Sequence, residues 1–262
     1  MLRTVNAVRY VTPLREGGSV PALVEADDDG LYVVKLRGAA QGPKALIAEL
    51  VAGELARAAG LAVPELVLIT LDAALGRAER HREISDLLDA SVGLNLALDY
   101  LPGSVTFDPV AGPTPDPALA SRLVLFDSFV TNVDRTPKNP NLLTWHRAIW
   151  LIDHGASLYF HHGWGPSDPL TESRDPFSFV RKHVLLPWAT ALAEAAAHLR
   201  ASWSEAFLTR VAQAIPDEFL TDDMGFASPD AHRAAYGAWL SARLAALPLI
   251  LAEAERARAE RV

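Results

Sequence analysis

The chain of 262 residues contains no cysteine, so it cannot carry a disulfide framework or a metal site built on thiolates. A reducing compartment suits such a chain, and we therefore expect a cytoplasmic protein. Residues 1–18 also lack the continuous apolar stretch of a signal peptide. The most apolar late stretch, residues 238–255, contains Arg243 and Pro248. We predict a helix of a soluble domain there and no membrane span.

Basic residues are also fewer than acidic ones in this chain. The chain has 24 Lys and Arg against 32 Asp and Glu, which gives a formal net charge of −8. This balance argues against a nucleic-acid partner, because such binding depends on neutralising phosphates. The glycine patterns of the P-loop and of dinucleotide-binding folds are missing as well. Hydrophobic residues, in contrast, make up 50% of the chain, which is enough for a substantial core.

The sequence changes character along its length. Short β-branched runs, separated by turn-forming residues, predict strands in the first 38 residues, and apolar residues at helical spacing dominate later. Proline and glycine are frequent over residues 102–116, which we interpret as a linker. We predict an α+β fold with two lobes: a small β-rich lobe over residues 1–102 and a larger, mainly helical lobe over residues 103–262. The expected strands are 4–11, 21–26, 31–38, 65–70, 94–100, 141–145 and 148–155, and the expected helices before residue 131 are 42–60, 78–91 and 118–130.

One lysine lies within the apolar strand YVVKLRG, residues 32–38. Lys35 has apolar neighbours on both sides, and a lysine at a strand edge often extends its ammonium group to water. A buried lysine would instead need an acidic partner. The helix that follows offers Glu49, with Glu54 as a rival for the same role.

The loop TNVDRTPKNPNLL, residues 131–143, is unusually polar for a segment beside a core helix. Asp134 and Asn139 are five residues apart, and Pro137 and Pro140 restrict the backbone between and after them. Phosphoryl transfer uses a carboxylate beside the attacking hydroxyl and an amide oxygen that holds a metal. The alternative is an ordinary turn rich in Asn and Asp.

A second carboxylate follows a predicted strand in LIDHG, residues 151–155. Asp153 stands at the strand end, and Gly155 comes two residues later. A carboxylate in this place can reach a divalent ion bound to a triphosphate, although a capped turn would have the same composition. The order Lys, Glu, Asp-x4-Asn and Asp-x-Gly rarely arises by chance, and it indicates phosphoryl transfer.

These motifs resemble those of the HipA-like kinases, a branch of the protein-kinase-like superfamily that is also similar to the phosphoinositide kinases. The resemblance covers about residues 15–165 and fades after residue 180. It implies a two-lobed protein-kinase-like fold, with ATP and Mg²⁺ as cofactors. It also implies that Lys35 contacts the α- and β-phosphates and pairs with Glu49, and that Asp134 orients or deprotonates the substrate hydroxyl. The other implied contacts are Asn139 and Asp153 to Mg²⁺, Asp99, Tyr100 and Leu101 of the hinge to adenine, and Gly17, Gly18 and Ser19 to the phosphates.

The chain departs from the family pattern at two positions of these motifs. His154 stands where an aromatic residue commonly follows the metal-binding aspartate, and Thr136 where phosphoinositide-type loops tend to have histidine. Ser19 raises the hypothesis of self-phosphorylation, since a phosphate there would place negative charge where ATP phosphates bind. A turn serine with no regulatory role is the favoured alternative. His161 and His162 are expected to form a solvated or substrate-facing pair.

We predict an ATP- and Mg²⁺-dependent phosphotransferase that moves the γ-phosphate to a hydroxyl acceptor, with a protein serine or threonine as first choice. A small-molecule kinase that acts on a metabolite or an antibiotic is the alternative. A catalytically silent nucleotide-binding module is another alternative. A metallohydrolase built on Asp134, Asp153 and the histidines lacks the spacing of a His-rich metal site. The sequence does not define an oligomeric state.

Overall fold

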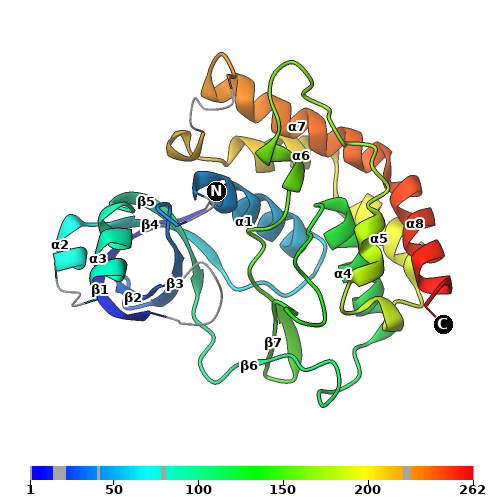
Figure 1. The fold of residues 1–262 in the computed structure, drawn as a ribbon, viewed down its shortest axis with the longest axis horizontal. Coiled ribbons are helices and arrows are strands. Elements are labelled where there is room, and N and C mark those ends of the chain that lie inside the picture. Colours follow the sequence, from blue (N-terminus) through cyan, green and yellow to red (C-terminus); the bar gives the residue numbers. More distant parts are fainter. Residues whose placement is uncertain (1, 14–21, 40–41, 78–80, 221–224, 262) are drawn as a thin grey trace.

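The computed structural model describes residues 2–13, 22–39, 42–77, 81–220 and 225–261. Two parts lie side by side (Figure 1): a small part made mostly of strands, and a larger part made mostly of helices. This confirms the predicted α+β fold class, with a β-rich N-terminal lobe and a mainly helical C-terminal region.

Five strands form a small closed barrel in the order β1, β2, β3, β5 and β4. Neighbouring strands are antiparallel except β1 and β4, which run parallel. In β3, the buried side chains of Tyr32 and Val34 alternate with those of Val33 and Lys35, so Lys35 lies on the opposite face of the strand from the Val34 cluster. The bounds are β1 (Thr4–Pro13), β2 (Ala22–Ala26), β3 (Leu31–Lys35), β4 (Leu66–Leu71) and β5 (Gly93–Asp99).

Helix α1 (Gly42–Ala58) is buried through most of its length between the barrel and the helical part. A Cβ atom at Gly53 would lie 2.4 Å from Leu66 Cδ1, so the helix packs closely on β4. Gly60, with φ +70°, ends the helix, and the N–H groups of Gly60 and Leu61 bond the last turn. A helix that is buried on nearly all sides belongs to the core. The position of α1 between the two parts of the protein is therefore fixed by packing.

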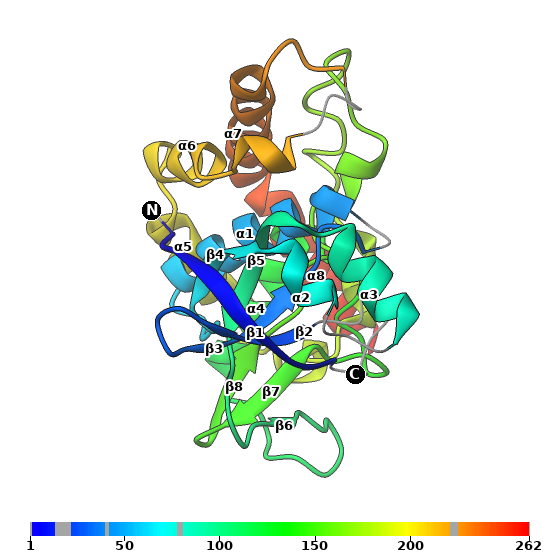
Figure 2. The same cartoon turned by 90° about the vertical axis from the view of Figure 1, so that its left-hand side faces the viewer.

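Two short helices lie against one side of the barrel (Figures 1 and 2). They are α2 (Ala73–Arg77) and α3 (Arg82–Asp89). The predicted helix at 78–91 is thus shorter than expected in its described part, and α2 was not predicted. The structure does not describe residues 78–80.

The segment predicted as a linker contains a short strand, β6 (Val105–Thr106). It pairs with β7 (Leu142–Trp145), which pairs in turn with β8 (Ala148–Leu151). Between β6 and β7 lies α4 (Pro117–Phe129), whose N-terminus is capped by Asp116 through a 2.9 Å bond from the Leu119 N–H. This arrangement places the polar loop 131–143 between a buried helix and a small sheet.

After β8 the described part of the chain runs through irregular segments and short 3-10 turns to four α-helices, which complete the helical part around α4 and α1 (Figure 1). Among the described residues, no single helix is long and apolar enough to cross a membrane. Helices α7 and α8 satisfy the length and composition only as a pair, and they are bent by 57° where they meet. The helices are α5 (Leu192–Ser202), α6 (Glu205–Gln213), α7 (Pro229–Ala245) and α8 (Leu247–Ala259), and the 3-10 turns are η1 (Tyr159–His162), η2 (Ser178–Lys182), η3 (Leu186–Trp188) and η4 (Asp217–Phe219).

Candidate active site

Lys35 lies between two carboxylates that come from distant parts of the chain. Its Nζ atom is 2.6 Å from Asp153 Oδ1 and 3.9 Å from Glu49 Oε2. Burial alone would lower the pKa of Lys35, but Glu49 and Asp153 outweigh it and raise the pKa above its usual value. The Lys35 side chain is only 14% exposed, so the lysine does not extend to water as an isolated group.

Glu49 sits in the buried middle of α1 with no solvent exposure. One of its oxygens accepts the backbone N–H of His154 at 2.8 Å, and the other lies 3.2 Å from His154 Nδ1. Its rival Glu54 instead lies 3.9 Å from Arg57, on the partly exposed side of the same helix. The structure therefore brings Glu49, and not Glu54, to Lys35.

Asp153 adopts a left-handed backbone conformation with φ +56°, which costs a non-glycine residue about 1–2 kcal/mol. Such strain persists where surrounding contacts fix the backbone, and here Lys35 holds the side chain while Glu49 holds the next N–H. Burial would raise the pKa of Asp153, but the Lys35 ammonium outweighs it and lowers the pKa. The carboxylate is 36% exposed and thus accessible to a cation.

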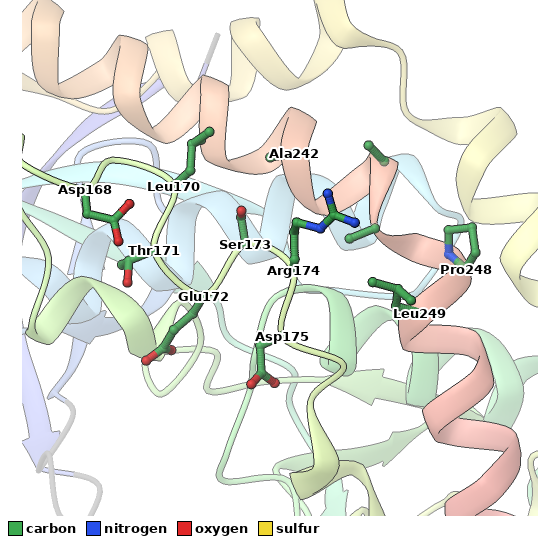
Figure 3. A pocket seen from close by; sticks show the side chains of 12 residues that line it. Asp168, Leu170, Thr171, Glu172, Ser173, Arg174, Asp175, Ala242, Pro248 and Leu249 are labelled. Atoms are coloured by element: carbon green, nitrogen blue, oxygen red, sulfur yellow. The ribbon is translucent and has the colours of Figure 1, made fainter.

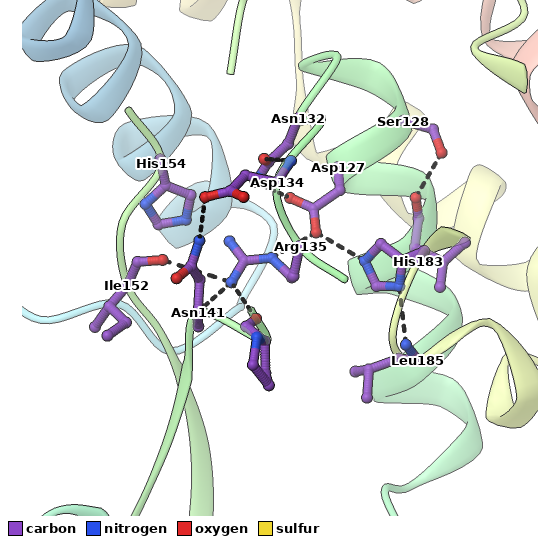
Figure 4. A network of polar contacts seen from close by, with 12 residues as sticks. Asp127, Ser128, Asn132, Asp134, Arg135, Asn141, Ile152, His154, His183 and Leu185 are labelled. Carbon is purple, nitrogen blue, oxygen red and sulfur yellow. Dashed lines mark hydrogen bonds and ion pairs between the residues drawn. The ribbon is translucent and has the colours of Figure 1, made fainter. Parts of the chain in front are cut away.

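The polar loop holds Asp134 through amide groups (Figure 4). Asn139 Nδ2 donates to Asp134 Oδ2 at 2.7 Å, and Asn141 Nδ2 donates to the same oxygen at 3.1 Å. The Asp134 N–H donates to Asn132 Oδ1 at 3.0 Å. With its Nδ2 turned to Asp134, Asn139 keeps its oxygen for another partner. Asn141 and Asn132 were not singled out from the sequence.

Asp127 lies in α4, the helix that precedes this loop, and it is fully buried. It anchors the loop to that helix. Its Oδ1 accepts Asn132 Nδ2 at 3.0 Å, and its Oδ2 accepts Arg135 Nε at 2.6 Å and lies 2.8 Å from His183 Nε2. Since the Leu185 N–H donates to His183 Nδ1 at 3.0 Å, Nε2 carries the hydrogen that points to Asp127. Burial would raise the pKa of Asp127, but Arg135 and His183 lower it.

Arg135 connects this anchor to the strand before Asp153. Its NH1 group donates to the carbonyl of Asn141, to that of Pro140 at 3.3 Å and to that of Ile152 at 3.5 Å (Figure 4). The side chain is fully buried. One guanidinium thus links α4, the loop and the end of β8. Sequence reasoning missed Asp127, Arg135 and His183; the only local signal was an aspartate inside an apolar helical run.

The predicted hinge leads from β5 to β6. The N–H of Asp99 donates to Glu65 O and the N–H of Tyr100 donates to Leu31 O, both at 2.9 Å. Within the described ranges, the N–H of Leu101 makes no backbone hydrogen bond. Gly17, Gly18 and Ser19 lie outside the described residues.

The prediction of a solvated histidine pair is wrong for His161. This side chain is fully buried, and its Nδ1 lies 3.1 Å from the hydroxyl of Tyr236. Burial, with a further contribution from His162 and Lys44, holds the pKa of His161 well below its usual value. His162 is exposed. The part of the chain that the structure describes holds no group of three or more His, Cys, Asp or Glu side chains placed to bind a metal.

The segment after Asp153 is fixed to α7 by aromatic and polar contacts. Phe160 stacks on Trp239 with ring centroids 3.9 Å apart, and Trp164 packs on Tyr236 at 4.6 Å. Arg243, fully buried, donates to carbonyls at the end of α4 and in the segment itself. Burial lowers the pKa of Arg243 to about 10, so it stays charged at neutral pH. These aromatic residues are anchors of the segment.

A hollow of about 680 Å³ lies between residues 168–175 and the junction of α7 and α8 (Figure 3). Acidic side chains of Asp168, Glu172 and Asp175 line it together with apolar ones such as Leu170 and Leu249. Among the residues that the structure describes, its lining includes none of the site residues above. The hollow is therefore separate from the candidate active site.

The donor set suits a divalent cation bound to a nucleotide. Asp153 offers a carboxylate and Asn139 an amide oxygen, and hard cations such as Mg²⁺ prefer oxygen ligands. Lys35 supplies the positive charge that phosphate groups need. The residues present thus fit ATP with Mg²⁺.

The barrel, the helical lobe and this constellation together define a protein of the kinase-like class. The fold is similar to the Helicobacter pylori proinflammatory kinase CtkA, with a TM-score of 0.62, 12% identity and coverage of 98% of this chain and 99% of that chain. It is also similar to the Golgi casein kinase with Mn/ADP bound, with a TM-score of 0.50, 11% identity and coverage of 95% and 72%. At these identities the likeness shows the fold alone. No curated protein gives a significant match.

The sequence itself matches the HipA-like kinase family over residues 7–227. This match spans most of the chain, and the protein belongs to the HipA-like kinase family. The family resemblance predicted from the motifs at Lys35, Asp134 and Asp153 is thereby confirmed.

Proposed function

We propose that the protein is an ATP- and Mg²⁺-dependent phosphotransferase that moves the γ-phosphate to a hydroxyl acceptor. The observation that carries the proposal is the position of Lys35, whose Nζ atom lies 2.6 Å from Asp153 and 3.9 Å from Glu49. Asp134 lies near enough for its charge to raise the pKa of Lys35 further. A silent nucleotide-binding module would need no carboxylate at Asp134.

The proposed roles follow from the charges of the site residues. Lys35 contacts the α- and β-phosphates, and Glu49 keeps the ammonium group of Lys35 oriented. Asp153 and Asn139 hold Mg²⁺, which would neutralise phosphate charge during transfer. The hinge of Asp99, Tyr100 and Leu101 receives adenine, with the Leu101 N–H as donor.

Asp134 is proposed to orient the acceptor hydroxyl and to accept its proton. Two amide groups donate to its Oδ2, which fixes the carboxylate plane and leaves Oδ1 for the acceptor. A carboxylate held in this way loses little freedom when the acceptor binds. The charge of Arg135 is directed to Asp127 and to carbonyl groups, so it does not neutralise Asp134.

Two features support the choice of cofactors and acceptor. A structure with a similar fold carries Mn/ADP, which supports a nucleotide and a divalent cation here. The name of that relative, casein kinase, supports a protein acceptor, and we propose serine or threonine hydroxyls. A metabolite or antibiotic hydroxyl is the competing acceptor.

The test is transfer of labelled γ-phosphate from ATP with Mg²⁺ to a serine/threonine peptide library and, separately, to a library of small hydroxyl compounds. We expect labelled peptides with the wild-type protein and labelling that is slower by about 10²–10⁴ with Asp134→Asn. Labelled small molecules alone would support the competing acceptor. ATP·Mg²⁺ binding with no transfer to either library, and none to the protein itself, would identify a silent nucleotide-binding module.

A further inference from the structure

His154 follows the proposed metal ligand Asp153, and its side chain has no solvent exposure. Its ring meets Phe126 edge-on, with centroids 6.0 Å apart and planes at 82°. Its backbone and its ring both reach Glu49: the N–H donates to Oε2 at 2.8 Å, and Nδ1 lies 3.2 Å from Oε1. One residue therefore contacts both oxygens of a buried carboxylate.

The partner fixes the tautomer of the ring. The Glu49 carboxylate, which faces the Lys35 ammonium, only accepts hydrogen bonds, so the hydrogen of the ring must be on Nδ1. The other nitrogen, Nε2, is buried and has no hydrogen-bond partner in the part of the chain that the structure describes. A phenyl ring would fill the same space without leaving a buried polar atom unpaired. Histidine is therefore a costly way to fill the space, and its Nδ1–H is the group that offsets the cost.

We propose that His154 is a positioning residue that holds the Glu49 carboxylate toward Lys35, and so prepares Lys35 to bind nucleotide phosphates. This inference rests on the proposed function. The two bonds from His154 fix the rotation of the carboxylate about its own axis, and thereby the distance between Oε2 and Lys35. Without the ring donor, Glu49 Oε1 has a buried lone pair without a partner, and the carboxylate turns. Lys35 then pairs with Asp153 alone, which opposes release of Asp153 to a cation.

Three substitutions separate the donor from the ring. In His154→Asn, the side-chain amide nitrogen takes the place of Nδ1, so the bond to Glu49 is kept while ring packing is lost. His154→Gln moves the amide to the place of Nε2 and loses the bond. His154→Phe keeps the ring and loses the donor.

The readout is affinity for ADP·Mg²⁺ by calorimetry, with KM for ATP, kcat and thermal melting measured in parallel. We expect His154→Phe and His154→Gln to bind ADP·Mg²⁺ about 10-fold more weakly, the usual size of losing a hydrogen bond to a charged group. His154→Asn should bind within about 3-fold of wild type, although its melting temperature is lower than that of His154→Phe. Equal affinity for His154→Phe and wild type, or equal loss in His154→Asn and His154→Phe, would overturn the proposal.

A second measurement needs no activity. In the nucleotide-free protein, ¹⁵N-histidine NMR should show one ring with hydrogen on Nδ1 that disappears in His154→Phe and shifts in Glu49→Gln. A ring with hydrogen on Nε2 at this position would overturn the positioning role. If wild type shows the Nδ1–H ring but binds no nucleotide, the proposed function fails while the contact to Glu49 stands.

Discussion

Lys35 and Asp153, 118 residues apart in the chain, form an ion pair with 2.6 Å between Nζ and Oδ1. The pair joins the barrel to the segment after β8, and Glu49 lies 3.9 Å away on the other side of the lysine. Three charges in this order carry a net negative charge, which a divalent cation would balance. The arrangement explains why Lys35 is charged although it is largely buried.

Lys35→Met should weaken ATP·Mg²⁺ binding and abolish transfer. Methionine fills the same space in an apolar strand, and Glu49 keeps both contacts to His154, so we expect circular dichroism to show an intact fold. Lys182→Met is the matched control, because Lys182 is exposed and lies over the ring of Phe179. Near wild-type transfer by Lys35→Met would mean that the lysine has no part in nucleotide binding.

Glu49→Gln should reduce ATP affinity and transfer more mildly than Lys35→Met, because glutamine keeps the shape of the side chain. It loses the charge that faces Lys35 and one of the two oxygens that face the donors of His154. Glu54→Gln is the control: its carboxylate lies 3.9 Å from Arg57 and is partly exposed, and exposed pairs contribute at most about 1 kcal/mol. Calorimetry with ADP·Mg²⁺ ranks the two variants. The reverse ranking would give the partner role to Glu54.

Periodicity was sufficient to predict most strands and helices, and spacing with family resemblance was sufficient to select Lys35, Asp134, Asn139 and Asp153. The residue pattern alone left Glu54 as a rival of Glu49, and only the family resemblance selected Glu49. Helix α1 is buried on nearly all sides and has no amphipathic face to show which residues point inward. The strand β6 was missed for a related reason. It has two residues, and only its pairing with β7 makes it a strand.

The anchor at Asp127 shows a second limit of sequence reasoning. Its partner His183 is 56 residues away, and no local pattern connects the two. His161 was misread because its segment is rich in polar and turn-forming residues, whereas its contact to Tyr236 comes from a helix 75 residues later. Contacts over such distances are set by how the elements pack, which a single sequence does not reveal.

Asp127→Asn should destabilise the protein by about 3–5 kcal/mol, since removing one partner of a buried ion pair leaves Arg135 uncompensated. Turnover should fall as well, because Asn132 and Arg135 position the Asp134 loop through this carboxylate. Urea unfolding measures the first effect. Asp86→Asn, at an exposed pair with 3.7 Å to Arg82, should change stability by less than about 0.5 kcal/mol. Equal stability of Asp127→Asn and wild type would remove the anchoring role.

The stability of the protein should fall as the pH drops below 6.5, the ordinary pKa of histidine. Burial lowers the pKa of His161 in the folded state, so the unfolded chain binds more protons than the folded chain below pH 6.5. The stabilisation is complete above this pH and is lost as the pH falls toward the folded pKa. Each such group contributes a slope of at most about 1.4 kcal/mol per pH unit.

His161→Phe, which keeps a ring beside Tyr236, should therefore show a shallower pH dependence of the unfolding free energy between about pH 5 and 6.5. The lowered pKa of His183, caused by burial, leaves a residual slope in the same direction. Burial also lowers the pKa of His162, which adds to this residual slope. His146→Asn, at an exposed histidine elsewhere in the fold, is the control. Identical slopes in His161→Phe and wild type would contradict the assignment.

The two aspartates should respond differently to the same substitution. Asp153 is proposed to hold the cation and Asp134 to face the acceptor hydroxyl, so Asp153→Asn should weaken ATP·Mg²⁺ binding and Asp134→Asn should leave it nearly unchanged. Asp134→Asn should still lose about 10²–10⁴ in turnover, the usual contribution of a group that accepts a proton. Asparagine at 134 keeps the shape of the side chain, although one of the amide donors from Asn139 and Asn141 then faces a weaker acceptor.

Calorimetry with ATP·Mg²⁺ and single-turnover transfer measure the two roles independently. Loss of ATP binding in Asp134→Asn with retention in Asp153→Asn would reverse the roles, and full transfer by both variants would refute the kinase proposal, because neither carboxylate would then be needed for the chemistry.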